Sequence, residues 1–263
     1  MPFQQFSSMK PVKNPCGSDL QVSELLWEWY QTPLGKALAE EENAHLETVL
    51  PMLFGYYLLQ MGKPFEPSYL GSSLIRKKFI MKQCALQCND NGLVSSATSL
   101  AIASDSVDVV ILPHVLELQV NPHQVLREVD RVLVAEGHVV ILGFNPWGMW
   151  GVRNWAARGK STPPWCANFL SPFRVKDWLR LLNFDLQMAA TFFHKPPINT
   201  NYVQNHLSRW DAVSRKLWPA FGGSYILVAK KEVLTLTKIP KRWRPMKKLV
   251  KTRLAETSTS HHR

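Results

Sequence analysis

The chain has 263 residues, of which 46% are hydrophobic and 19% charged, which is enough apolar material for one large buried core. Its apolar runs are too short to span a bilayer, and its N-terminus lacks the charged-then-apolar pattern of a signal peptide, so we expect a cytoplasmic protein. The net charge of +11 is uneven, because residues 230–263 hold eleven Lys or Arg and only two acids. The basic character therefore belongs to the tail.

Two helices are predicted after a flexible lead-in at residues 1–18. They span residues 20–30 and 35–53, and between them Thr32 can cap the second helix while Pro33 suits its first position. The first helix ends in aromatic side chains that either line a pocket or pack as ordinary core residues, namely Trp27, Trp29 and Tyr30.

Two strands are predicted next, at residues 56–61 and 78–83. Gly62 begins the exit loop of the first of them. A glycine at such a position lets the backbone turn sharply or approach a ligand.

Residues 104–146 carry the clearest pattern of the chain, a strand, a helix, a turn and a second strand. Residues 107–112 are aliphatic apart from Asp108, as in a strand that is covered on both faces, and residues 138–143 form the second strand. A crossover of this length implies a right-handed parallel βαβ unit. Ligands of such sheets bind beyond the carboxyl ends of the strands.

The helix of this unit has recognisable ends. Asn121 offers an N-cap side chain and Pro122 suits the first helical position. Apolar residues follow at helical spacing, and Glu136 with Gly137 ends the helix and turns the chain.

The segment after the second strand, residues 146–165, is rich in Gly, Trp and Pro. It either forms a lid over a substrate or packs its aromatic rings on the core, and the side chains concerned are Trp147, Trp150, Trp155 and Trp165, with Arg153 and Arg158. An amphipathic helix at residues 171–182, opened by Ser171, comes next. Two last strands are predicted at residues 184–191 and 224–230.

The stretch SDSVDVV…NPHQVLREVDRVLVAEGHVVILGFNP resembles the second half of class I S-adenosylmethionine-dependent methyltransferases, close to the type 11 kind. LPHVLE and GFNP resemble a bacterial group of this superfamily with an altered cofactor motif, and so do WEWYQTPLGKAL, Glu42 and GYYLLQMG. The resemblance covers residues 20–230. It implies an α/β fold with a Rossmann-like doubly wound sheet of seven strands, in the order 3-2-1-4-5-7-6, whose last strand is antiparallel.

The resemblance also suggests how the chain is divided. A methyltransferase-like domain at residues 19–232 follows the lead-in, and a basic, disordered tail at residues 233–263 ends the chain. Within the domain we expect N-terminal helices at residues 19–54 and a lid insertion at residues 146–170.

S-adenosyl-L-methionine is the cofactor that the resemblance implies. Gln60 stands where the family has an acid, and Gly62 matches the first glycine of the binding loop. Pro64 occupies the second glycine's place and Glu66 roughly the third's, and proline, with its fixed φ and no N–H, cannot reproduce the usual loop.

The remaining cofactor contacts follow from the same resemblance. No acid ends the second strand, so Gln83 or Asn89 is expected to hold the ribose. Ser96, with Ala97, stands where the family commonly has an acid at the adenine, and Pro113 ends the next strand of the site.

Two residues are candidates for catalysis. His114 follows a strand end that faces substrate in the family, and it either acts as a general base or only orders its loop. Glu117 can orient His114 or face solvent. Asn145 either orients the substrate or forms an Asx turn before Pro146.

Two functions remain open at this level. The first is methyl transfer to an unidentified acceptor. The second is a methyltransferase fold with lost or weakened cofactor binding that serves as a nucleic-acid-binding or regulatory module. In the second case the segment from Lys238 to Arg253 would grip phosphates and Trp243 would stack on a base. The tail could equally be a solvated extension, or bind acidic membrane lipid.

The sequence lacks the motifs of several other enzyme classes. The sequence contains no GxxxxGK[ST], HExxH or GxSxG pattern, which argues against the common NTPase, zincin and hydrolase classes. Its cysteines, Cys16, Cys84, Cys88 and Cys166, form no pair of CxxC motifs, so we expect no bound metal and free thiols.

Overall fold

The computed structural model describes residues 19–62, 70–82, 93–157, 164–197 and 221–233. Predictions for the lead-in, the loop with Pro64 and Glu66, Gln83 and the basic tail lie outside these residues. The domain boundaries and the nucleic-acid role of the tail therefore stay predictions.

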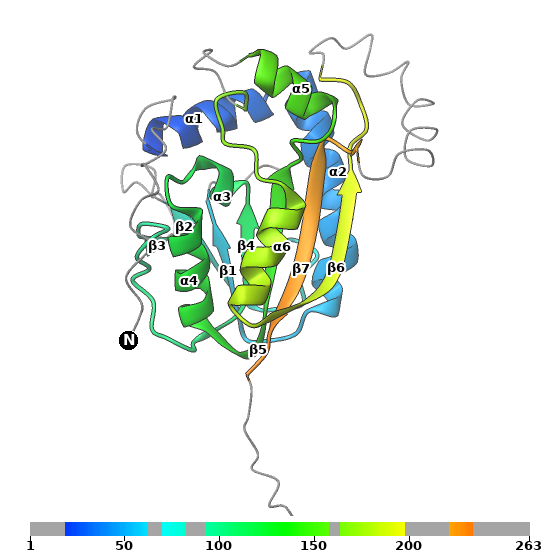
Figure 1. Ribbon diagram of the computed structural model, residues 1–263. Helices are drawn as coiled ribbons and strands as arrows, with labels where there is room; N and C mark the ends of the chain where they lie inside the picture. The colour runs from blue at the N-terminus through cyan, green and yellow to red at the C-terminus, as the bar shows by residue number, and fades with distance from the viewer. Residues whose placement is uncertain (1–18, 63–69, 83–92, 158–163, 198–220, 234–263) are drawn as a thin grey trace, which may run out of the picture. The chain divides into compact units, whose positions relative to one another are not determined.

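A seven-stranded sheet forms the centre of the described part, in the order β3-β2-β1-β4-β5-β7-β6 (Figure 1). Neighbouring strands from β3 to β5 are parallel, whereas β7 runs antiparallel to both β5 and β6. The predicted strand order and the reversed strand are thus confirmed. The strands are β1 (Tyr57–Met61), β2 (Lys77–Lys82), β3 (Leu93–Val94), β4 (Val107–Pro113), β5 (Leu133–Phe144), β6 (Phe184–Phe192) and β7 (Ser224–Lys231).

Helices cover both faces of this sheet. Figure 1 shows α2 behind the strands, α4 and α6 in front of them, and α1, α3 and α5 beside the end where the parallel strands stop. The helices are α1 (Asp19–Tyr30), α2 (Pro33–Val49), followed by the 3-10 turn η1 (Leu50–Met52), α3 (Val115–Leu118), α4 (Pro122–Val132), α5 (Met149–Ala156) and α6 (Pro172–Leu181).

The aliphatic run of β4 is buried on both sides because it supplies two cores. Val109 and Ile111 pack in the cluster beneath α1 and α2, while Val110 and Leu112 pack in the cluster beneath α4 and α6. A strand whose alternate side chains enter two apolar layers must be apolar at nearly every position.

Two polar side chains fix the starts of β1 and α2 by accepting hydrogen bonds from backbone N–H groups. Asp108, the acid of β4, accepts hydrogen bonds from the backbone N–H groups of Tyr56 and Tyr57, each at 2.9 Å, and so fastens the start of β1 to β4. Thr32 caps α2 as predicted, because its Oγ1 accepts the Gly35 N–H at 3.2 Å.

The helix of the βαβ unit, α4, differs from the prediction at both ends. Asn121 occupies the N-cap position but its side chain makes no capping hydrogen bond, so that part of the prediction is wrong. At the other end the helix stops at Val132 rather than near Glu136, and β5 begins at once. The predicted turn lies inside β5, where Glu136 has a φ of 66°.

Pairing with β4 explains this early strand start. Leu133 pairs with Val107, but the next pair is Val109 with His138, so β5 carries an irregularity between them. Gly137 lies in it, and a Cβ atom there would stand 2.9 Å from the Val134 carbonyl oxygen.

Cys166 departs from the expectation of free thiols. It is disulfide-bonded and 7% exposed. The other three cysteines of the sequence lie outside the described residues.

Candidate active site

The carboxyl ends of β1 and β4 lie side by side at the point where the sheet order reverses. Chain connections leave this point in opposite directions, and in doubly wound sheets that is where ligands bind. Residues from these two strand ends and from α2 build the candidate site.

Gly62 follows β1 directly and has the backbone that the glycine prediction requires. Its φ is +95°, a conformation that other residues rarely adopt, and its N–H donates to the Met81 carbonyl oxygen of β2 at 3.1 Å. A Cβ atom on Gly62 would stand 3.3 Å from Cγ2 of Val115 in α3, the helix that follows β4. The bare backbone thus faces the β4 exit at close range.

Gln60 ends in a buried amide without a partner. It is 1% exposed on β1, on the face that also carries Leu58, and neither Nε2 nor Oε1 has a hydrogen-bond partner among the described residues. An unpaired buried amide costs about 1–3 kcal/mol. Such a group needs an explanation, and a ligand that pairs with it is one.

The other predicted cofactor residues are spread along the same edge. Ser96 is exposed and its Oγ lies 2.9 Å from Oγ1 of Thr98, whereas Ala97 is fully buried. Pro113 ends β4 and is buried beside Gly62. Gln83 and Asn89 lie outside the described residues.

His114 is held between two carboxylates. It has no exposed surface, its Nε2 lies 2.8 Å from Oε1 of Glu42, and its Nδ1 lies 3.1 Å from Oε2 of Glu117. Its backbone is left-handed, with φ 54° and ψ 20°, which turns the chain from β4 into α3. Both ring nitrogens are therefore engaged within the protein.

Each carboxylate has further donors. The hydroxyl of Tyr30, at the end of α1, donates to both oxygens of Glu42 at 3.2 Å. The backbone N–H of Phe144 donates to Oε1 of Glu117 at the end of β5. We call Tyr30, Glu42, His114 and Glu117 the buried polar network, since it ties α1, α2, the β4 exit and the β5 end together.

Charge keeps His114 protonated. Burial alone lowers the pKa of its imidazole, but the charge of Glu42 and the hydrogen bonds to Glu117 and Glu42 raise this pKa to about 9. Burial also raises the pKa of Glu117, against the hydrogen bond and charge of His114. Near neutral pH the imidazolium holds its proton, and of the two alternatives for Glu117 the contact with His114 is the one that the structure has.

The general-base role of His114 stays a prediction that this geometry does not favour. A base must begin without its proton and must reach the group that it deprotonates. Here the ring is protonated and packs against the Phe144 ring at a tilt of 33°, with ring centroids 4.1 Å apart. The alternative, that His114 orders its loop, is supported by its contacts with Glu42 and Glu117.

Asn145 forms the predicted Asx turn. Its Oδ1 accepts the N–H of Trp147 at 3.1 Å and its Nδ2 donates to the Gly222 carbonyl oxygen at 2.9 Å. The side chain is 1% exposed and joins the end of β5 to the start of β7. A role in orienting a substrate remains a prediction.

The tryptophans of the expected lid divide into two groups. Trp150 and Trp165 are buried and pack on each other, with centroids 5.4 Å apart, whereas Trp147 and Trp155 are 64% and 67% exposed. Trp150 also stacks on Phe144, at 5.7 Å. Packing on the core and exposure at the surface therefore both occur in this one segment.

Glu42 is the residue whose role the sequence did not reveal. It entered only as part of the family resemblance, 72 positions away from His114. The signal available in the sequence was its position on the apolar stripe of α2, four residues from both Leu38 and Leu46, because a carboxylate that such a stripe buries requires a partner.

Comparisons with known proteins agree with this architecture. A family model described as a methyltransferase domain matches residues 75–141. A methyltransferase structure from Archaeoglobus fulgidus superimposes with a TM-score of 0.52 at 19% identity, covering 73% of this chain and 94% of that one. Another, from Thermotoga maritima, gives 0.51 at 14% identity and covers 78% and 100%.

The fold is that of class I S-adenosylmethionine-dependent methyltransferases. The fold that the resemblance implied is thereby confirmed. A relative from Escherichia coli strain K12, the uncharacterized protein YafS, is 29% identical over 224 residues, which is 81% of this chain and 83% of the relative.

Two features are absent from the part of the chain that the structure describes. None of the helices in this part combines the length and the apolar content needed to cross a membrane. None of the His, Cys, Asp and Glu side chains in this part gather in a group of three or more that could hold a metal ion.

Proposed function

We propose that this protein is a methyltransferase that uses S-adenosyl-L-methionine and binds it at the carboxyl ends of β1 and β4. The observation that supports this most is the unpaired buried amide of Gln60 beside the left-handed Gly62. Both lie at the reversal point of a sheet whose fold is that of class I methyltransferases.

The described residues fit the chemistry of the cofactor at this point. An amide can donate and accept hydrogen bonds at once, so Gln60 suits the charged methionine end of the cofactor. Gly62 lets the backbone come close to it, and Ser96 with Ala97 would meet the adenine. The bound cofactor would supply a methyl group on a positively charged sulfur.

The protein's own contribution is alignment and exclusion of water. Transfer of a methyl group needs the acceptor in line with the reactive bond, and it is accelerated when the acceptor loses its water. The buried polar network fixes the β4 exit, while Phe144 packs against His114 and Trp150 stacks on Phe144. In this scheme His114 is a positioning residue, and the acceptor itself enters deprotonated or neutral.

Binding of S-adenosylhomocysteine tests the proposal. We expect the ligand to raise the melting temperature and to give a saturable calorimetric titration. Absence of both effects at millimolar ligand, with the protein folded, would contradict the proposal. Gly62→Val should abolish the binding, because a β-branched side chain is strained at φ +95° and its Cβ crowds Val115.

A further inference from the structure

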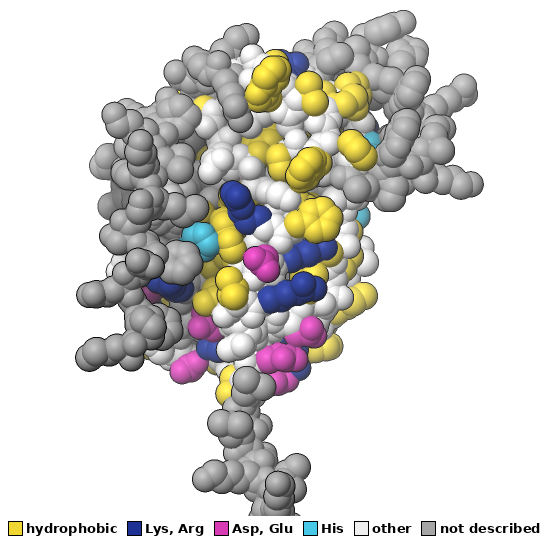
Figure 2. Space-filling view, in the orientation of Figure 1, with side chains coloured by type: hydrophobic (Ala, Val, Ile, Leu, Met, Phe, Trp, Pro, Cys, Tyr) yellow, Lys and Arg dark blue, Asp and Glu magenta, His cyan; other side chains and the backbone are white. Residues whose placement is uncertain are grey.

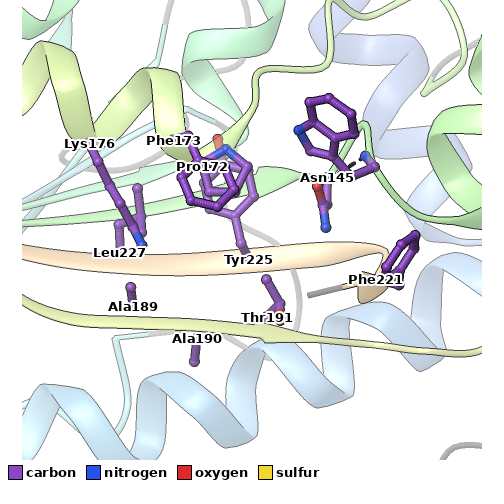
Figure 3. A pocket seen from close by; sticks show the side chains of 11 residues that line it. Asn145, Pro172, Phe173, Lys176, Ala189, Ala190, Thr191, Phe221, Tyr225 and Leu227 are labelled. Atoms are coloured by element: carbon purple, nitrogen blue, oxygen red, sulfur yellow. Dashed lines mark hydrogen bonds between the residues drawn. The ribbon is translucent and has the colours of Figure 1, made fainter. Parts of the chain in front are cut away.

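A cavity of about 640 Å³ lies apart from the β1 and β4 exits, between α6 and the strands β6 and β7 (Figure 3). In the sheet, β4 and β5 separate it from β1. It starts at the end of β5 and follows the α6 side of the edge strand. The described residues that line it are Asn145, Trp147, Pro172, Phe173, Lys176, Ala189, Ala190, Thr191, Phe221, Tyr225 and Leu227.

Large apolar side chains surround its mouth. Trp147, Phe173 and Phe221 are 64%, 70% and 54% exposed, and they come from three separate segments that meet here. Figure 2 shows hydrophobic side chains next to Lys and Arg on the face that carries α6. Exposed aromatic rings that converge on one cavity indicate a binding site rather than scattered surface residues.

Small residues keep the cavity open. Ala189 and Thr191 lie on β6 where the side chains face α6, and Ala189 is exposed. Tyr225 forms part of the wall with 1% of its surface exposed, and burial together with the charge of Glu117 raises the pKa of its hydroxyl well above the usual value. The tyrosine therefore contributes a neutral surface.

Lys176 is the charged residue among those that line the cavity. It is half-buried, extends from α6 toward β7 (Figure 3), and lies over the Phe173 ring with Nζ 5.6 Å from the centroid. Among the described residues it has no acidic partner within ion-pair distance, whereas Lys231 lies within 3.5 Å of both Asp105 and Asp130. A half-buried ammonium group in an apolar setting favours an anion beside it.

We propose that this cavity binds a small amphipathic anion, with its apolar body against Trp147, Phe173 and Phe221 and its single carboxylate, sulfonate or phosphate group at Nζ of Lys176. The volume suits a ligand of one or two fused rings or a short branched chain. The site needs neither the cofactor nor the β1 exit, so it stands whether or not methyl transfer is the function.

A matched pair of fluorescent probes tests the charge requirement. Anilinonaphthalene sulfonate carries one negative charge, and N-phenyl-naphthylamine has the same rings without it. We expect both to bind, and Lys176→Gln to weaken the sulfonate about tenfold while leaving the neutral probe unchanged. Arg180→Gln, at an exposed position one turn along α6, is the control and should alter neither affinity.

A second variant tests the location. Ala189→Phe fills the cavity from an exposed strand position, so it should weaken both probes while the far-UV spectrum and the melting temperature stay those of the wild type. The proposal is overturned if Lys176→Gln leaves the sulfonate affinity unchanged, or lowers both affinities equally. It is also overturned if Ala189→Phe leaves both unchanged, since the probes would then bind elsewhere.

Discussion

The neighbouring ends of β1 and β4 differ in whether their buried polar groups have hydrogen-bond partners. At the β4 exit every polar atom of His114 has a partner, and two carboxylates, a hydroxyl and a backbone N–H complete the network. At the β1 exit the amide of Gln60 is buried and has no hydrogen-bond partner among the residues that the structure describes. The first arrangement is complete within the described residues, whereas the proposed function has the cofactor complete the second.

Removal of the His114 imidazolium from the buried polar network gives the largest expected effect on stability. His114→Asn keeps a residue that tolerates left-handed backbone but leaves Glu42 and Glu117 buried without their positive partner. We expect the free energy of unfolding to fall by about 3–5 kcal/mol, measured by chemical denaturation at pH 7.

A second histidine serves as the comparison for that measurement. His123 lies at an exposed position on α4, where one side of its ring packs against Trp178 with centroids 3.9 Å apart, and His123→Asn should cost about 1 kcal/mol or less. Equal losses in the two variants would show that the buried network contributes nothing special.

Alkaline pH should weaken the same network. A histidine pKa raised to about 9 contributes stability that is fully present below the unfolded value near 6.5 and is lost as pH rises through 9. The raised pKa of Glu117 acts with the same sign, from its ordinary value upward. We expect the unfolding free energy of the wild type to drop by about 2–3 kcal/mol between these limits.

The His114→Asn variant isolates this contribution, because all other titrating groups remain. The lowered pKa values of His123 and His138, which arise mainly from burial, favour the folded state as pH rises and affect both proteins alike. A wild-type profile parallel to that of the variant would mean that His114 does not titrate in this window.

Replacement of the unpaired amide should separate stability from binding. Gln60→Leu removes a buried group without a partner, so we expect the unfolding free energy to rise by about 1–2 kcal/mol. The affinity for S-adenosylhomocysteine should fall at least tenfold in calorimetry. Gln187→Leu, at an exposed position on the edge strand β6, is the control and should leave that affinity unchanged.

The opposite result would be equally informative. If Gln60→Leu destabilises the protein and binds the ligand normally, the amide has a structural partner in solution and the contrast between the two strand ends disappears.

Local sequence patterns predicted the elements because each depends on neighbouring residues. Thr32 and Pro33 set the start of α2, and the aliphatic run of β4 indicated a strand buried on both faces. The end of α4 was misjudged because Leu133 pairs with Val107 across the sheet, and this pairing draws the residues before Glu136 into a strand. Tertiary pairing overrode a local turn signal.

Side chains of α4 also make contacts outside the helix that its sequence pattern did not predict. Arg131 donates to the Leu100 and Ile102 carbonyl oxygens, while Glu128 accepts the Leu100 N–H. They hold the loop after β3 against α4, and spacing within the helix could not show that.

The sequence by itself determined the strands and their candidate ends through apolar periodicity and turn residues, which act over short distances, while the sheet order and the reversed strand followed from the family resemblance. Only the tertiary structure decided the chemistry of those ends. Glu42 meets His114 across 72 positions, and Lys176 meets Phe221 and Thr191 at one cavity, since burial and partners depend on which elements pack together. The fold brought an isolated histidine between two acids, and that placement changed it from a candidate base into a protonated anchor.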